Sequence, residues 1–255
     1  MCLAVLAWNV APGQRVALAA NRDEFHARPT APMAWWDAPP VLAGRDLSAG
    51  GTWLGLDGRR RFGVITNFRG APPPPQAPSR GTLIPRFLAG SLAPADFLRQ
   101  LALEADRYAG FSLLLADEDS LGYFCNREAG PPRTLPAGVY GLSNATLDAP
   151  WPKLVQSRAA LTARLGSGAL RPEDLLEVVA DRGVAADAEL PDTGVGVELE
   201  RRLSPAFIVG CDYGTRSSTA LTLDATGRGA VVELSFGIDG ARAGSRRFTL
   251  GPAPF

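Results

Sequence analysis

The stretch that decides the fold is MCLAVLAWNVAPGQRVALAANRDE, residues 1–24. Two strand-forming runs, residues 3–8 and 15–22, are separated by the turn sequence Ala11-Pro12-Gly13-Gln14. A Pro-Gly turn between two such runs predicts a β-hairpin. Both runs consist largely of small and branched apolar residues, which is typical of strands covered on both faces. The chain is therefore expected to begin with a hairpin that other elements cover.

Strands and helices follow in groups along the rest of the chain. Segments rich in branched or alternating apolar residues are predicted as strands: 52–56, 61–67, 111–116, 122–126, 138–142, 206–211, 219–224, 230–236 and 246–250. Segments with helical spacing, several with Pro near the start, are predicted as helices: 83–89, 94–108, 151–165 and 172–182. The segments 27–50, 71–78 and 186–201 are predicted as loops. This order predicts an α+β architecture of layered sheets and helices, in a single domain spanning residues 1–255.

Composition excludes several function classes. The 255 residues are 46% hydrophobic and 20% charged, with 26 basic and 26 acidic residues and no net charge. A neutral chain is not expected to bind nucleic acid, because phosphate binding needs a surplus of basic residues. No apolar run is long enough to cross a bilayer, and the apolar segment 2–7 has no basic leader. We therefore expect a cytoplasmic protein with no stable membrane insertion, whose oligomeric state stays open.

Few residues are suited to hold a metal or a cofactor. The chain has one histidine, His26, and three cysteines, Cys2, Cys125 and Cys211, without CxxC spacing. A structural zinc site needs four nitrogen or sulfur ligands, and an odd cysteine count argues against a disulfide framework. No phosphate loop or dinucleotide fingerprint is present. No metal and no cofactor are predicted. The only lysine is Lys153, and we interpret the excess of arginine as genome composition.

Cys2 is the most informative position because it directly follows the initiator Met. Aminopeptidases remove Met when the next residue is small, and removal would leave a free α-amine on the residue that carries the thiol. The unperturbed pKa of an α-amine is about 8, close to about 8.5 for a thiol, so the amine can take the thiol proton. This is the arrangement of a nucleophile activated by its own terminal amine. The alternative is a small buried residue that begins a strand.

Four polar residues, Asn21-Arg22-Asp23-Glu24, end the second predicted strand. Strand alternation places Asn21 and Asp23 on one side and Arg22 and Glu24 on the other. An aspartate near an N-terminal cysteine would hold and orient its α-ammonium group. The alternative is a charged turn that caps the hairpin. His26, without a second histidine, is expected to make a local hydrogen bond.

Polar residues at three other strand ends are also candidate site residues. Asn144 follows an apolar strand and precedes a helix, where its amide is able to donate to an oxyanion; the alternative is an ordinary turn residue. Arg216 begins a late strand, and a guanidinium near Cys2 would favour the thiolate; the alternative is a surface arginine. Asn67 ends the strand FGVITN and offers a further donor.

Several short motifs occur together in a fixed order. They are Met-Cys at the start, AANRDEF near residue 20, GGTWLG at 50–55, ITNF at 65–68, SRG at 79–81, YGLSN at 140–144 and YGTRSST at 213–219. The ordered set resembles the NRDE family, which includes eukaryotic transport and Golgi organisation proteins, over nearly the whole chain. That family in turn resembles N-terminal-nucleophile hydrolases such as penicillin V acylase and bile salt hydrolase.

The resemblance implies a four-layer αββα sandwich and a set of catalytic residues. Cys2 would be the nucleophile, Asp23 the aspartate of the N-x-D element, and Arg216 the late arginine near the nucleophile. Asn144 and Asn67 would be the oxyanion donors. The arginine that precedes N-x-D in those acylases is absent here, with Ala19-Ala20 in its place. Arg22 and Glu24 have no counterpart in the acylases.

Two functions remain open from the sequence. The first is an N-terminal cysteine amidohydrolase that cleaves a linear, non-peptide amide through a Cys2 acyl-enzyme. The second is a non-catalytic binding or trafficking protein on the same scaffold, with an apolar ligand such as haem or a lipid. Residues predicted to contact the substrate or ligand are Asn21, Arg22, Glu24 and Trp53. Cys2→Ala separates the two, because ligand binding alone does not need the thiol.

Overall fold

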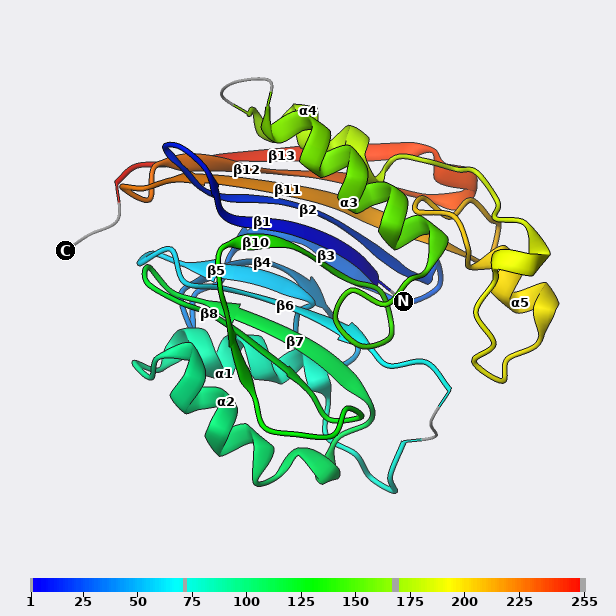
Figure 1. Cartoon of the computed structure of the whole chain (residues 1–255), viewed down its shortest axis with the longest axis horizontal. Helices are drawn as coiled ribbons and strands as arrows, with labels where there is room; N and C mark the ends of the chain where they lie inside the picture. Colours follow the sequence, from blue (N-terminus) through cyan, green and yellow to red (C-terminus); the bar gives the residue numbers. More distant parts are fainter. Residues whose placement is uncertain (1, 71–72, 167–169, 253–255) are drawn as a thin grey trace. The chain divides into compact units, whose positions relative to one another are not determined.

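The computed structural model describes residues 2–70, 73–166 and 170–252, so residues 71–72 of the predicted loop lie outside the described residues. Its contacts divide the chain into two compact units (Figure 1). The first contains the residues up to Ala27 together with Ala137–Ser143 and Leu147–Gly251, and the second contains Arg28–Pro136 and Asn144–Thr146. Each unit combines segments that are far apart in the sequence. The single domain predicted for residues 1–255 stays a prediction.

The first unit is built on a six-stranded antiparallel sheet. Its strands, in spatial order, are β10 (Gly138–Leu142), β1 (Cys2–Ala11), β2 (Gln14–Phe25), β11 (Tyr213–Asp224), β12 (Gly229–Phe236) and β13 (Arg242–Leu250). The central pair β2 and β11 joins the N-terminal hairpin to the C-terminal strands. Strands distant in sequence therefore meet at the centre of this sheet.

The predicted hairpin is present as β1 and β2. Ala11 pairs with Gln14 across the two-residue turn Pro12-Gly13. Gly13 has φ of 75°, the left-handed conformation that the second central residue of a type II turn requires. β2 is longer than predicted and runs to Phe25, so the polar residues 21–24 lie within the strand rather than in a turn.

The helices of the first unit pack on different strands of its sheet. α3 (Pro152–Leu165) packs against β1 and β10, and α4 (Pro172–Leu176) packs against β2, β11 and β12. Pro at the first helical position begins both, where its missing N–H costs no hydrogen bond. The described part of this unit also contains the 3₁₀ turns η3 (Glu177–Val179), η4 (Asp187–Glu189) and η5 (Ile238–Gly240).

The second unit contains a seven-stranded antiparallel sheet. Its strands, in spatial and sequence order, are β3 (Thr30–Trp35), β4 (Val41–Asp46), β5 (Leu54–Asp57), β6 (Phe62–Asn67), β7 (Phe111–Ala116), β8 (Leu121–Cys125) and β9 (Arg133–Leu135). The 3₁₀ turns η1 (Arg80–Thr82) and η2 (Ala105–Arg107) flank its helices. α1 (Leu83–Ala89) packs on β4, β5 and β6, and α2 (Pro94–Ala102) packs on β8. Their buried faces form one core with the sheet, which includes the edge-to-face pair Phe87 and Phe97.

Three predicted segments are corrected. The predicted loop 27–50 contains β3 and β4. The proline Pro32 does not exclude a strand here, because β3 is the edge strand of its sheet and an edge strand tolerates proline. The predicted strand 206–211 is not a strand, because neighbouring side chains bind part of its main chain. The predicted loop 186–201 contains η4 and most of α5 (Val197–Arg202).

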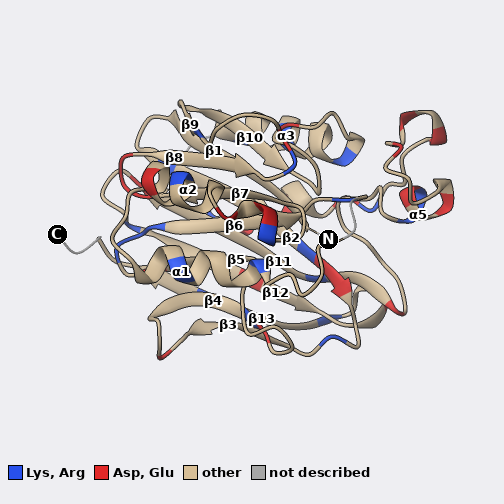
Figure 2. Cartoon of the chain, turned by 90° about the horizontal axis from the view of Figure 1, so that it is seen from below, with Lys and Arg blue, Asp and Glu red and all other residues tan. Residues whose placement is uncertain are grey.

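Charged residues are interspersed in both units. Figure 2 shows acidic and basic segments side by side on α5, where Arg201 pairs with Glu198 and with Asp187. Among the described residues, no helix is long and apolar enough to span a membrane. Within the same residues, no group of three or more His, Cys, Asp or Glu side chains is arranged to hold a metal ion.

Candidate active site

Cys2 is the first residue of β1 and lies directly opposite Arg22 of β2. Residues that face each other across an antiparallel pair project their side chains to the same side of the sheet. The sulfur of Cys2 and the guanidinium of Arg22 therefore share one face. As a residue, Cys2 is half-buried and makes no disulfide, whereas the next six residues of the strand are buried. The role of Cys2 as a nucleophile stays a prediction.

The surroundings of Cys2 keep its thiol protonated. Burial raises the pKa of the Cys2 thiol, and the carboxylate of Asp23 raises it further. The guanidinium of Arg22 and a hydrogen bond from the main-chain amide of Asp23 lower the pKa, but not enough to reverse the direction. A neutral thiol needs a base to make it a nucleophile. The site therefore suits activation by a neighbouring amine.

Asn21 and Asp23 project to the opposite face of β2, as alternation predicts. Asn21 Nδ2 donates to the carbonyls of Val179 and Ala206, at 2.7 and 2.8 Å. Asn21 Oδ1 accepts from the Ser218 hydroxyl at 2.6 Å. All the polar groups of these contacts belong to residues of the first unit. Asn21 is therefore a structural anchor of this unit, and its predicted contact with a substrate stays a prediction.

Asp23 is 1% exposed and accepts a hydrogen bond from the Thr215 hydroxyl at 2.7 Å. Burial raises the pKa of the Asp23 carboxyl. The charge of Lys153 opposes this most strongly, followed by the Thr215 hydrogen bond and Arg22 among the contacts of described side chains. A buried carboxyl with a positive neighbour is a frequent feature of functional sites.

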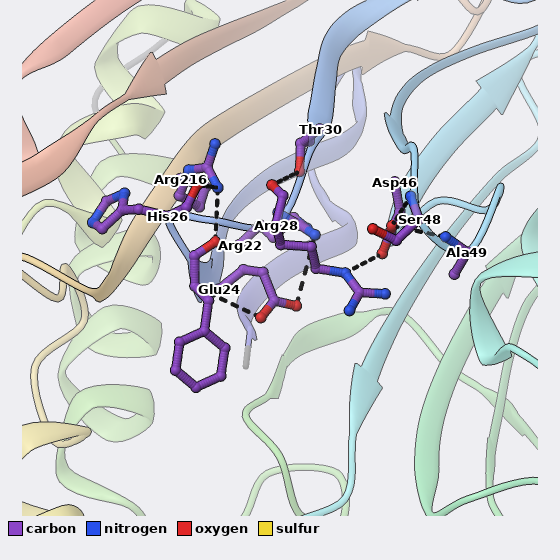
Figure 3. A network of polar contacts seen from close by, with 10 residues as sticks. Arg22, Glu24, His26, Arg28, Thr30, Asp46, Ser48, Ala49 and Arg216 are labelled. Atoms are coloured by element: carbon purple, nitrogen blue, oxygen red, sulfur yellow. Dashed lines mark hydrogen bonds and ion pairs between the residues drawn. The ribbon is translucent and has the colours of Figure 1, made fainter.

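Arg22 and Glu24 form an ion pair on the Cys2 face, with 3.7 Å between Nη2 and Oε2 (Figure 3). Arg22 is 5% exposed, and Glu24 Oε1 accepts from the main-chain amide of Phe25. Arg216 donates from Nη1 to the carbonyls of Phe25 and His26, at 2.9 and 3.2 Å. Burial and the charge of Arg22 lower the pKa of Arg216. Arg22, rather than Arg216, is the guanidinium in register with Cys2.

Figure 3 also shows a second set of contacts, within the second unit. Arg28 Nε lies 2.8 Å from Asp46 Oδ2, and Asp46 Oδ1 accepts from the main-chain amides of Ser48 and Ala49. The Arg28 hydrogen bond and these amides lower the pKa of Asp46 against the opposing effect of burial. The Thr30 hydroxyl donates a hydrogen bond to the carbonyl of Arg28. Together, these contacts of Arg28, Thr30 and Asp46 hold the beginning of β3 in place.

Asn67 and Asn144 lie together in the second unit. Asn144 Nδ2 donates to the carbonyl of Asn67 at 3.0 Å, and the Asn144 carbonyl accepts from the amide of Arg69. Asn144 is buried with φ of 57°, a left-handed conformation that asparagine tolerates better than most residues. One amide hydrogen of Asn144 is thus used within this unit. The oxyanion role of both asparagines stays a prediction.

Trp53 and His26 have local packing roles. Trp53 is 8% exposed, and its ring covers Gly44 so closely that a Cβ there would lie 2.4 Å from the ring. Its contact with a ligand stays a prediction. His26 Nε2 lies 3.0 Å from the carbonyl of Gly210, so its hydrogen bond is to a residue 184 positions away in the sequence and not to a near neighbour.

Lys153, Thr215 and Ser218 were not predicted as site residues. Thr215 and Ser218 lie within the YGTRSST motif, but their partners Asp23 and Asn21 are almost 200 positions away in the sequence. Lys153 is 4% exposed, and its Nζ donates to the carbonyl of Leu203 at 2.7 Å. Its one sequence signal is that it is the only lysine.

The sequence model of Transport and Golgi organisation 2 matches residues 1–237. The chain belongs to the Transport and Golgi organisation 2 family. Within this family, the mouse homolog is 32% identical and the human homolog 33% identical, each over 256 residues that cover 92% of this chain and 93% of the relative. The predicted family relation is therefore confirmed.

The solved structure of another protein is similar in fold to this chain. The Caenorhabditis elegans N-acylethanolamine-hydrolyzing acid amidase ortholog superimposes with a TM-score of 0.51 and 12% identity. The match covers 86% of this chain and 92% of the amidase. The predicted α+β fold class of N-terminal-nucleophile hydrolases is thereby confirmed.

A pH dependence follows from the buried Asp23. Because its pKa is raised in the folded chain, the folded state binds the proton more tightly than the unfolded state. The resulting stabilisation is fully present below the ordinary value, about 3.9, and is lost as the pH rises through the raised pKa. Asp23→Asn should remove this loss. Urea unfolding of both proteins between pH 4 and pH 8 should show the wild type falling relative to the variant as the pH rises; a constant difference would contradict the assignment.

Proposed function

We propose that this protein is an N-terminal cysteine amidohydrolase that cleaves a linear, non-peptide amide. The observation that carries the proposal is the position of Cys2. It is a half-buried residue at the beginning of β1, and the charge of the Asp23 carboxylate raises the pKa of its thiol. The fold shared with an amidase agrees with it. We further propose that the protein works in the cytoplasm, where reducing conditions keep the thiol free.

Acylation begins after removal of Met1. The free amine of Cys2 takes the thiol proton, and the sulfur attacks the amide carbon to form a tetrahedral adduct. When the adduct collapses, the carbon–nitrogen bond breaks, and the ammonium group returns its proton to the leaving amine. The products of this half-reaction are a Cys2 thioester and a free amine. The carboxylate of Asp23 stabilises the transient ammonium.

Deacylation reverses the proton transfers. The Cys2 amine takes a proton from water, the resulting hydroxide attacks the thioester carbon, and the carbon–sulfur bond breaks. The thiolate recovers the proton from the ammonium, and a carboxylic acid leaves. Over the cycle one amide and one water become one acid and one amine. We propose that Arg22, whose side chain projects to the same face as Cys2, attracts the carbonyl end of the substrate.

A cleavable extension tests the need for the free amine. The protein is expressed with an N-terminal extension whose protease site is cut directly before Cys2. After cutting, a panel of N-acyl p-nitroanilides should yield a burst of nitroaniline and an acyl adduct on Cys2, detected by intact mass. The uncut protein should react at least about 100-fold more slowly, because it lacks the general base.

The matched control leaves one additional Gly before Cys2 after cutting. This protein has a free amine, but the amine is one residue away from the thiol. It should be as inert as the uncut protein. Equal bursts from the Gly-extended and the correctly cut protein would show that the amine of Cys2 is not the base, and no burst from any of them would reject the amidohydrolase.

A further inference from the structure

β13 is an edge strand of the six-stranded sheet (Figure 1), and most of its residues are exposed. In the described part of the chain, the main chain of residues 242–250 makes no hydrogen bond besides those of its ladder with β12. An edge strand of this kind presents a row of N–H and C=O groups on its outer side. These groups of β13 are open to pairing with another strand.

The opposite edge of the same sheet, β10, is closed by local contacts. Asp148 Oδ1 accepts from the amide of Gly141 at 2.7 Å, and the Asp148 amide donates to the Gly141 carbonyl at 2.9 Å. Arg158 Nη2 donates to the carbonyl of Val139 at 3.0 Å. The fold thus occupies main-chain groups at one edge of this sheet and leaves those of β13 exposed.

A hollow of about 530 Å³ lies beside β13 and is lined by residues of α4, η3, β11, β12 and β13. Its apolar lining residues are Leu176, Ala180, Phe207, Val232, Leu234 and Phe236. Ser245 of β13 lies opposite Leu234 in the ladder, so both side chains project to the face that carries the hollow. Because serine is small, position 245 leaves room for a large apolar side chain from a strand added beside β13.

The rim of this hollow has a surplus of positive charge. Its charged residues are Arg242, Arg246, Arg247, Glu173 and Glu177. Glu173 pairs with Arg247, and Glu177 pairs with Arg164. Among the described residues, no carboxylate pairs with Arg242 or Arg246, and both are exposed. A guanidinium forms strong, directional pairs with a carboxylate, so this rim suits an acidic partner.

The same arginines disfavour a second copy of this chain as the partner. When two copies of β13 pair in antiparallel orientation about Arg246, the two Arg246 side chains face each other. Like charges directly opposite each other destabilise a strand pair, and basic residues on an edge strand protect it from pairing with itself. The edge is therefore selective, because it repels its own copy and attracts an acidic strand.

We propose that β13 binds an extended acidic segment of a partner protein by antiparallel strand addition. The segment places a carboxylate opposite Arg246, a large apolar side chain opposite Ser245 and a second carboxylate opposite Arg242. In an antiparallel pair this order corresponds to Glu-Phe-x-x-Glu or an equivalent sequence. Main-chain hydrogen bonds to β13 supply affinity, and the hollow and the two arginines supply specificity.

The test uses the full chain and a synthetic peptide with a central Glu-Phe-Thr-Thr-Glu sequence. The peptide should bind with a dissociation constant between about 1 µM and 1 mM, measured by fluorescence anisotropy. Amide hydrogen exchange of residues 242–250 should become slower in its presence. A version with N-methyl groups on alternate main-chain nitrogens should not bind, because it cannot complete the ladder. No binding of the parent peptide, or equal binding of both, would overturn the proposal.

Arg246→Glu tests the charge complementarity. This variant should bind the parent peptide at least about tenfold more weakly and should recover binding to a peptide with Lys-Phe-Thr-Thr-Glu. Arg228→Glu is the matched control, because Arg228 is exposed in the turn between β11 and β12 of the same sheet. The control should bind the parent peptide as the wild type does. Equal weakening in both variants, or no recovery, would show unspecific attraction and would contradict the proposal.

The hollow is tested by its apolar occupant. Replacing Phe by Ala in the peptide should weaken binding about tenfold, because a buried Phe side chain leaves water on binding. Decanoate is the probe for the alternative, a small amphiphilic acid that fills the hollow without a main chain. If decanoate binds more tightly than the peptide and leaves the exchange of residues 242–250 unchanged, strand addition is rejected.

Discussion

Cys2→Ala is expected to abolish acyl transfer, with a fall of at least about 10³-fold in the rate of amide cleavage. Alanine at position 2 also permits removal of Met1, so the variant retains a free amine and loses only the sulfur. The burst of nitroaniline and the acyl adduct should both disappear. Circular dichroism and the thermal midpoint should stay close to the wild type, because Cys2 lies at the partly exposed beginning of β1.

Cys211→Ala is the matched control for this variant. Cys211 is exposed and is the other accessible thiol among the described residues, since Cys125 is buried. The control should retain the full burst. An undiminished rate in Cys2→Ala would reject the cysteine mechanism. The non-catalytic alternative makes a different prediction: an apolar ligand such as haem would bind Cys2→Ala as tightly as the wild type, and neither protein would hydrolyse an amide.

Asn21→Ala should cause the largest loss of stability. The substitution removes three hydrogen bonds and leaves the carbonyls of Val179 and Ala206 and the hydroxyl of Ser218 without this partner in a buried place. Each unsatisfied buried group costs about 1–3 kcal/mol, so the three groups together are expected to cost about 3–9 kcal/mol. Urea unfolding at constant pH measures it. A protein of this size has about 5–15 kcal/mol in total.

Ser218→Ala separates the contributions. It removes one of the three contacts of Asn21 and keeps both carbonyl contacts. Its cost should be about 1 kcal/mol, well below that of Asn21→Ala. Equal costs for the two variants would show that the bonds to Val179 and Ala206 contribute little, and that Asn21 does not anchor the 203–208 segment.

Local signals allowed much of the fold to be predicted. The hairpin of β1 and β2 follows from two apolar runs and the Pro12-Gly13 turn, all within 25 residues. Alternation along β2 also correctly assigned residues 21–24 to two faces. The end of the strand was placed too early, because four polar residues ordinarily indicate a turn. Their partners on β11 and in the 203–208 segment have no local signal.

Long-range contacts explain the remaining differences. Residues 206–211 have a strand-like composition, yet Asn21 and Thr215 side chains bind the carbonyl of Ala206 and the amide of Ile208. The segment 27–50 looked irregular because of its prolines, although its edge position tolerates them. For the site, Cys2 and Asp23 could be identified from the sequence through position and motif. Lys153 could not, because its partners are determined by the packing of α3.

The alternation of side chains along β2 has a consequence for how such a protein diversifies. Substitutions at positions 22 and 24 leave in place the hydrogen bonds that Asn21 makes to Val179, Ala206 and Ser218 and that Asp23 accepts from Thr215. Substrate preference is therefore free to diverge while these contacts are retained. Insertion or deletion of one residue in this strand has the opposite result. It would transpose the two sets of side chains, and recognition and folding would be lost in a single event.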